Sequence, residues 1–95
     1  MTIENKVTLL QLAYEGFFSQ RDEFKQTAAD AIFALSNEIE DHVSEKVAAK
    51  DQAYCNSIIK GIQEHLENHF KNPASAKRDA GLEELLAKLT RIKYV

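Results

Sequence analysis

The sequence predicts an all-α protein: a four-helix antiparallel bundle within one chain, or helical hairpins that complete a bundle by dimerising. Apolar residues recur at steps of three and four along most of the chain, which is the helical period. Three Gly and one Pro are too few chain breakers for a β-rich or loop-rich fold. With 95 residues, 44% of them hydrophobic and 28% charged, the composition indicates a single globular domain over 1–95.

The first helix is expected over 3–15. Thr2 precedes it as a candidate N-cap, whose hydroxyl can accept a hydrogen bond from a free backbone N–H. Gly16 is expected to end the helix in the left-handed conformation. Leu9 and Leu12 widen the apolar seam. The seam itself, with alternating steps of four and three, consists of Ile3, Val7, Leu10, Tyr14 and Phe17.

A second helix is expected over 20–49 and a third over 52–70. Ser19 is a candidate N-cap of the second helix, so a short turn at 16–19 predicts an antiparallel hairpin. The apolar stripe begins at Phe24, weakens around Lys50 and resumes up to Phe70. Because the stripe stays in helical phase, one continuous helix over 20–70 is the alternative. It would be about 75 Å long and would need an oligomer to cover it. We favour the break, because the compactness of a single domain favours it.

The last helix is expected over 76–93. Pro73 ends the preceding helix, because proline lacks an N–H and disfavours helical geometry in the residue before it. Ser75 and Asp79 are the alternative starting points. Acidic residues lie early in this segment and basic residues late, an order that suits the helix dipole. Its apolar stripe comprises Leu82, Leu85, Leu86, Leu89 and Ile92.

The net charge of −3 is unevenly distributed. Residues 1–70 hold six basic and twelve acidic side chains, whereas 71–95 hold six basic and three acidic ones. Between Gln26 and Glu45 there are five acids and no Lys or Arg. This pattern is consistent with a basic last helix that packs against an acidic remainder of the chain. It also fits an acidic face that meets a basic partner.

No catalytic motif is present, and we expect neither an enzyme nor a cofactor. The serines lack the glycines of a nucleophile elbow, and the chain has no Gly-rich phosphate loop. Cys55, the single cysteine, has no basic neighbour and is expected to be a buried, unreactive thiol. The chain has no secretory pattern and no apolar run near the 20 or so residues of a membrane span, so we expect a cytoplasmic protein that does not bind membranes.

Two histidines form the one pattern that resembles a metal site. His65 and His69 are four residues apart, on one face of a helix, a spacing at which imidazoles can chelate Zn²⁺. His42 is a candidate third ligand, provided that the second and third helices pack antiparallel. Its alternatives are the carboxylates of Glu38, Asp41 and Glu45. We favour the simpler interpretation that both histidines flank the apolar stripe without binding metal.

The function we expect is that of a small acidic protein–protein interaction module, such as a regulator, adaptor, inhibitor or chaperone. Aromatic side chains are common anchors of interfaces. Tyr14 and Phe17 are also suited to the core, whereas Phe18 is expected to be partly exposed. The candidate partner-binding residues are Tyr14, Phe17, Phe18, Asp30, Glu38, Asp41 and Glu45.

Two other functions remain open. One is a DNA-associated regulator that uses the basic C-terminal helix, although the acidic first 70 residues would repel phosphate and disfavour nucleic acid. The other is a metal-binding bundle. The long apolar stripes favour a homodimer over a monomer, because they offer more apolar surface than one short chain is expected to cover.

Overall fold

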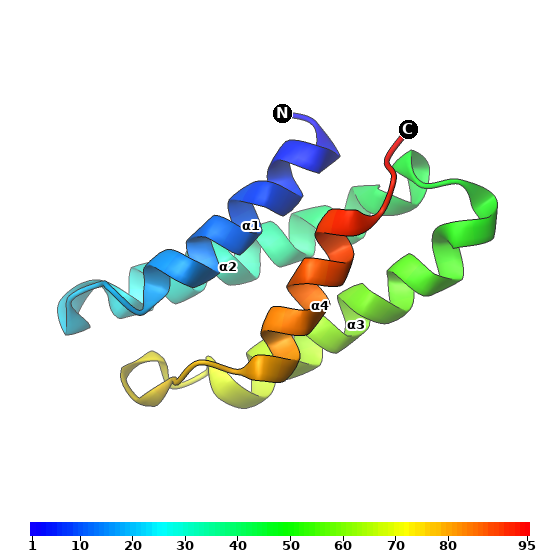
Figure 1. Ribbon diagram of the computed structural model, residues 1–95. Coiled ribbons are helices and arrows are strands. Elements are labelled where there is room, and N and C mark those ends of the chain that lie inside the picture. The colour runs from blue at the N-terminus through cyan, green and yellow to red at the C-terminus, as the bar shows by residue number, and fades with distance from the viewer.

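The computed structural model describes all 95 residues, and its four helices form a bundle within one chain (Figure 1). Consecutive helices run in opposite directions, so the first two and the last two form hairpins whose loops lie at one end of the molecule. Each helix packs against two neighbours, and the closest pairs are those within each hairpin. The predicted all-α fold is therefore confirmed. The helices are α1 (Ile3–Phe17), α2 (Asp22–His42), α3 (Gln52–His69) and α4 (Ala80–Arg91).

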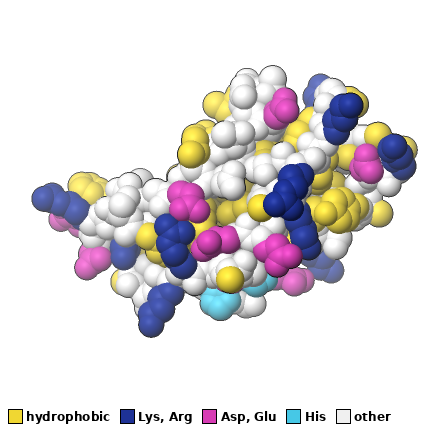
Figure 2. Space-filling view, viewed as in Figure 1, with side chains coloured by type: hydrophobic (Ala, Val, Ile, Leu, Met, Phe, Trp, Pro, Cys, Tyr) yellow, Lys and Arg dark blue, Asp and Glu magenta, His cyan; other side chains and the backbone are white.

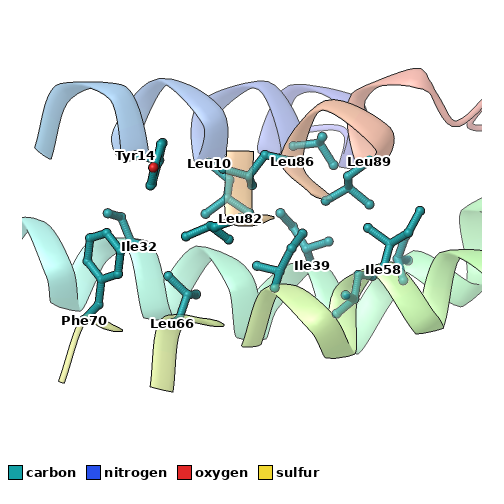
Figure 3. Close-up of a cluster of buried hydrophobic side chains, with 14 of the residues drawn as sticks. Leu10, Tyr14, Ile32, Ile39, Ile58, Leu66, Phe70, Leu82, Leu86 and Leu89 are labelled. Atoms are coloured by element: carbon teal, nitrogen blue, oxygen red, sulfur yellow. The ribbon is translucent and has the colours of Figure 1, made fainter. Parts of the chain in front are cut away.

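The hydrophobic core lies between two layers, α1 with α4 on one side and α2 with α3 on the other (Figure 3). Tyr14 of α1 points toward Ile32 of α2, and Leu10, Leu82 and Leu89 belong to the same interior. No buried polar side-chain atom lacks a hydrogen-bond partner. One chain thus closes its own core, so the apolar stripes no longer argue for a second copy.

The start of α1 agrees with the sequence, but its end and the start of α2 do not. The Thr2 hydroxyl accepts a hydrogen bond from the Asn5 N–H at 3.1 Å, as predicted for an N-cap. Gly16 does not end α1: the helix continues to Phe17, and no residue has a positive φ. Ser19 does not cap α2 either. Its hydroxyl donates to the Gly16 carbonyl at 2.9 Å, and α2 begins after Arg21 without a side-chain cap.

The break between the second and third helices is confirmed, and the continuous helix over 20–70 is wrong. The predicted end at residue 49 is also wrong, since α2 stops at His42 and two 3₁₀ turns follow, Val43–Lys46 and Ala49–Asp51. Between these turns Val47 is extended and forms an isolated antiparallel bridge with Tyr94. Val47 is nevertheless buried in the core. The helical spacing of the apolar residues therefore predicted its burial correctly, although its backbone is not helical.

The last helix is shorter than the predicted 76–93. Of the two predicted starting points, Asp79 is the N-cap, because its carboxylate accepts a hydrogen bond from the Leu82 N–H. Pro73–Ser75 instead forms a 3₁₀ turn that packs on α2. At the other end of α4, the backbone turns away so that the Val95 N–H donates to the Lys46 carbonyl at 2.8 Å. None of the four helices combines the length and the apolar composition that a membrane-spanning helix needs.

Tyr94 should make the stability of the fold depend on pH in the alkaline range. Its hydroxyl donates to the Leu89 carbonyl at 2.7 Å, and burial raises its pKa above the ordinary value of about 10. The unfolded chain therefore ionises Tyr94 at a lower pH than the folded chain does. The stability that this group contributes is complete below about pH 10 and is lost as the pH rises beyond it.

We expect Tyr94→Phe to lower the free energy of unfolding by about 1 kcal/mol at neutral pH, through the lost hydrogen bond. It should also flatten the decline in stability at alkaline pH. Urea denaturation at several pH values measures both effects, with the exposed Tyr54→Phe as the control. An alkaline decline as steep as that of the unmodified protein would contradict this account.

Candidate functional site

Three large apolar side chains are exposed on α1 and α2. Leu12 is 61% exposed, Phe24 50% and Leu9 40%. Leu12 is two residues from both Leu10 and Tyr14, which are buried, so it lies on the opposite side of α1. A Cβ added at Gly16, one turn after Leu12, would meet nothing within 4 Å. The surface of α1 is therefore open at Gly16, one turn beyond Leu12.

Exposed acidic side chains form a row on a neighbouring face of α2, about 100–120° around the helix from Phe24. Glu23, Asp30 and Asp41 are exposed and follow one another at 7 and 11 residues, spacings that keep them on one helix face. Asp30 accepts a hydrogen bond from the Gln26 amide at 2.9 Å, and Asp41 forms no ion pair. These acids and the exposed Leu9, Leu12 and Phe24, together with Gly16, are called the outer surface of α1 and α2 below.

The other two predicted partner-binding acids are placed differently. Glu38 forms an ion pair with Lys6 of α1 at 2.7 Å, and the hydrogen bond from Lys6 lowers the pKa of the Glu38 carboxyl. Glu45 lies beyond α2, in the first 3₁₀ turn, beside a groove that Met1 and His42 also line. Asp30 and Asp41 therefore share one face of α2, about three turns apart, whereas Glu45 lies beyond the helix.

The aromatic candidates belong mostly to the core. Tyr14 and Phe17 are 1% and 0% exposed, so neither side chain offers surface to a partner, and the expectation that they bind one is wrong for the folded chain. Phe18 is half-buried, as predicted, and packs edge-on against Tyr14 and Phe17 with ring centres 5.2 and 5.1 Å apart. The Arg78 guanidinium covers it at 5.0 Å from the ring centre. Phe18 thus closes the end of the bundle.

A polar network joins α1 to the start of α4. The Tyr14 hydroxyl donates to the Glu83 carboxylate at 2.7 Å and accepts from the Asp79 N–H at 3.0 Å. Burial, assisted by the Glu83 carboxylate, raises the pKa of Tyr14 to about 12. Arg78 pairs with Glu15 at 3.0 Å and with Glu83 at 3.6 Å. The sequence carried no signal of this network, because its members are up to 69 residues apart.

The Asp79 carboxylate also lies next to the imidazoles of the two candidate histidines. One of its oxygens lies 2.7 Å from Nδ1 of His65 and 3.4 Å from Nε2 of His69. The other oxygen accepts from the Leu82 N–H at 3.2 Å. Burial alone would raise the pKa of Asp79, but the hydrogen bonds from His65 and Leu82 outweigh it, so this pKa lies below its usual value.

The predicted third partner of the histidine pair is wrong. His42 lies in the groove beside Met1, at the end of α2, and does not join the pair. None of Glu38, Asp41 and Glu45 joins it either, since the acid beside the pair is Asp79. The only feature of the sequence that singled out Asp79 was its suitability as the N-cap of the last helix. Figure 2 shows histidine side chains at the lower edge of the molecule, with acidic side chains next to them.

A glycine makes room for this arrangement. A Cβ added at Gly81 would lie 2.8 Å from Cε1 of His65, closer than side chains normally approach. The lack of a side chain in the first turn of α4 therefore allows the imidazole to reach the Asp79 carboxylate.

The basic C-terminal segment is partly neutralised within the chain. Lys71 pairs with Glu67 and Lys88 with Glu84, while Arg78 is held by the acids described above. The positive charge available to a phosphate backbone is accordingly smaller than the sequence suggests. Three of the six basic side chains form no ion pair: Lys77, Arg91 and Lys93.

Comparison of the chain with protein-family models, with curated proteins and with solved structures gives no match. The candidate sites of this protein are therefore defined by their own geometry: an apolar and acidic outer surface on α1 and α2, and a cluster of two histidines and a carboxylate where α3 meets α4.

Proposed function

We propose that the protein is a small protein-binding module whose outer surface of α1 and α2 docks a basic amphipathic helix of a partner protein. The observation that carries this proposal is the exposure of Leu9, Leu12 and Phe24 on a surface that the core does not use. A helix that binds in a groove places its apolar residues at i, i+3, i+4 and i+7 against such side chains.

The shape of the surface suits a helical partner. α1 and α2 pack against each other and run antiparallel (Figure 1), so a partner helix can lie along both of them. Gly16 supports close approach, because nothing occupies the space above it. Leu12 and Phe24 are large enough to act as the apolar anchors of such an interface.

The charge of the surface selects the kind of partner. Glu23, Asp30 and Asp41 face solvent on α2, and the chain has no Lys or Arg between Gln26 and Glu45. A partner helix with Lys or Arg beside its apolar stripe would complement this charge and associate faster at low salt. An acidic partner would be repelled.

A displayed library of helical peptides tests the proposal directly. We expect the selected peptides to be amphipathic and basic, and their binding to weaken as salt rises from about 50 to about 300 mM. Gly16→Lys and Asp30→Lys should each weaken binding about tenfold or more, a loss of at least 1.4 kcal/mol. Gly16→Lys should leave the fold intact, since it replaces glycine within a helix by a better helix former in open space.

Tyr54→Lys is the matched control, because Tyr54 is an exposed apolar side chain of α3, outside the proposed surface. The proposal is overturned if the selected peptides bind the unmodified protein and the three variants equally well. It is also overturned if the selection yields no basic amphipathic peptides. A homodimer is the competing occupant of this surface. A solution mass twice the 10.8 kDa of one chain, reduced to one chain by Gly16→Lys, would assign the surface to a second copy.

A further inference from the structure

We propose that His65, His69 and Asp79 form a binding site for a divalent transition-metal ion of the zinc type where α3 meets α4. Two imidazole nitrogens and one carboxylate oxygen, one atom from each residue, all lie within 4.8 Å of one another. This set is independent of the outer surface of α1 and α2, so the inference does not depend on the proposed function.

The two distances to the Asp79 oxygen are close to those that a zinc ion requires, whereas the two imidazole nitrogens are within 4.8 Å of each other and would have to approach to bind the same ion. Zn²⁺ binds imidazole nitrogen and carboxylate oxygen at about 2.0–2.2 Å, so two ligand atoms of a tetrahedral site are about 3.3 Å apart. The His69 Nε2 to Asp79 oxygen distance is already 3.4 Å. The His65 Nδ1 to Asp79 oxygen distance is 2.7 Å, a hydrogen bond that must open by about half an ångström.

The ligands are held in place by the fold. His65 and His69 are on consecutive turns of α3, which directs both imidazoles to the same side. Asp79 is fixed at two points, since one carboxylate oxygen caps α4 through the Leu82 N–H and its own N–H donates to Tyr14. The remaining oxygen is thereby left facing both histidines, and Gly81 keeps the space for His65.

The surroundings admit a cation. His69 is 52% exposed at its side chain and His65 34%, so an ion can reach them from solvent. Two basic side chains line the same groove as His69 and Asp79: Arg78 is balanced by Glu15 and Glu83, and Lys77 forms no ion pair. Three protein ligands leave a fourth position for water or an anion. The mixture of two nitrogens and one oxygen favours Zn²⁺, Co²⁺ or Ni²⁺ over Ca²⁺ and Mg²⁺, which prefer oxygen ligands.

Titration with Zn²⁺ and Co²⁺ tests the site, with calorimetry for stoichiometry and Co²⁺ absorption for coordination by the histidines. We expect one ion per chain and a rise in the thermal midpoint. Removing a residue that hydrogen-bonds to a metal ligand commonly lowers the metal affinity about 10–100-fold. Loss of a direct ligand, in His69→Gln or Asp79→Asn, should lower the affinity at least as much. Both variants should fold, because His69 is exposed and Asn retains the helix cap.

The third histidine supplies a matched control. His42→Gln removes an imidazole in the groove beside Met1 and should leave the affinity and the Co²⁺ spectrum unchanged. The proposal is overturned if the unmodified protein binds no ion under these conditions. It is equally overturned if His69→Gln and Asp79→Asn bind as tightly as the unmodified protein, or if His42→Gln loses binding to the same extent as they do.

Discussion

Replacing Phe17 by alanine is expected to lower the free energy of unfolding by about 3–5 kcal/mol. Phe17 is fully buried, and its ring centre lies 4.9 Å from that of Phe70 and 5.1 Å from that of Phe18. Truncation removes the buried ring and leaves a cavity that the helices can only partly fill. Since small domains are stable by only about 5–15 kcal/mol, this change would remove much of the stability of the bundle.

Phe24→Ala is the matched control, because Phe24 has the same side chain but is half exposed. We expect it to change the free energy of unfolding by less than about 1 kcal/mol, as surface substitutions usually do. Urea denaturation followed by circular dichroism measures both variants. Equal losses for Phe17→Ala and Phe24→Ala would show that the aromatic cluster is not the packed end of the bundle.

Tyr14→Phe is expected to lower the free energy of unfolding by about 1.5–3 kcal/mol, the range for hydrogen bonds to charged groups. The substitution keeps the buried ring and removes only the hydroxyl. It thereby leaves the Glu83 carboxylate without its 2.7 Å donor and the Asp79 N–H without its acceptor. Because Asp79 also caps α4, the variant should weaken the attachment of the start of that helix to α1.

Tyr54→Phe provides the control for this substitution, since Tyr54 is exposed and its hydroxyl forms no hydrogen bond within the chain. We expect it to be neutral. A double-mutant cycle with Glu83→Gln isolates the contribution of the Tyr14–Glu83 pair. Additive effects of the two substitutions would contradict a direct interaction, whereas a coupling of about 1 kcal/mol would support it.

Helix caps show how far local sequence rules extend in this protein. Thr2 and Asp79 cap their helices as their residue types predict, because each satisfies a backbone N–H three residues away. Ser19 and Gly16 have residue types that predict a cap and a stop, yet α1 continues past Gly16 and α2 begins later. Phe17 explains the first difference, since it continues the apolar seam and is drawn into the core.

The end of α2 is a second place where the local sequence pattern does not predict the structure. Val43 and Val47 extend the apolar stripe in helical phase, and both are buried, but Val47 reaches the core from an extended backbone. Its conformation depends on a bridge to Tyr94 and on the hydrogen bond from Val95 to Lys46. These contacts join residues almost fifty positions apart, so no local pattern could reveal them.

The sequence by itself determined the helices, the apolar faces that they bury and the antiparallel order of the bundle, because these depend on the spacing of residues along one helix and on short connections. The tertiary structure alone decided that one chain closes the core, that Leu12 and Phe24 remain exposed, and that Asp79 rather than His42 meets His65 and His69. The physical reason is distance along the chain: a carboxylate and two imidazoles from different helices come together only after the helices have packed.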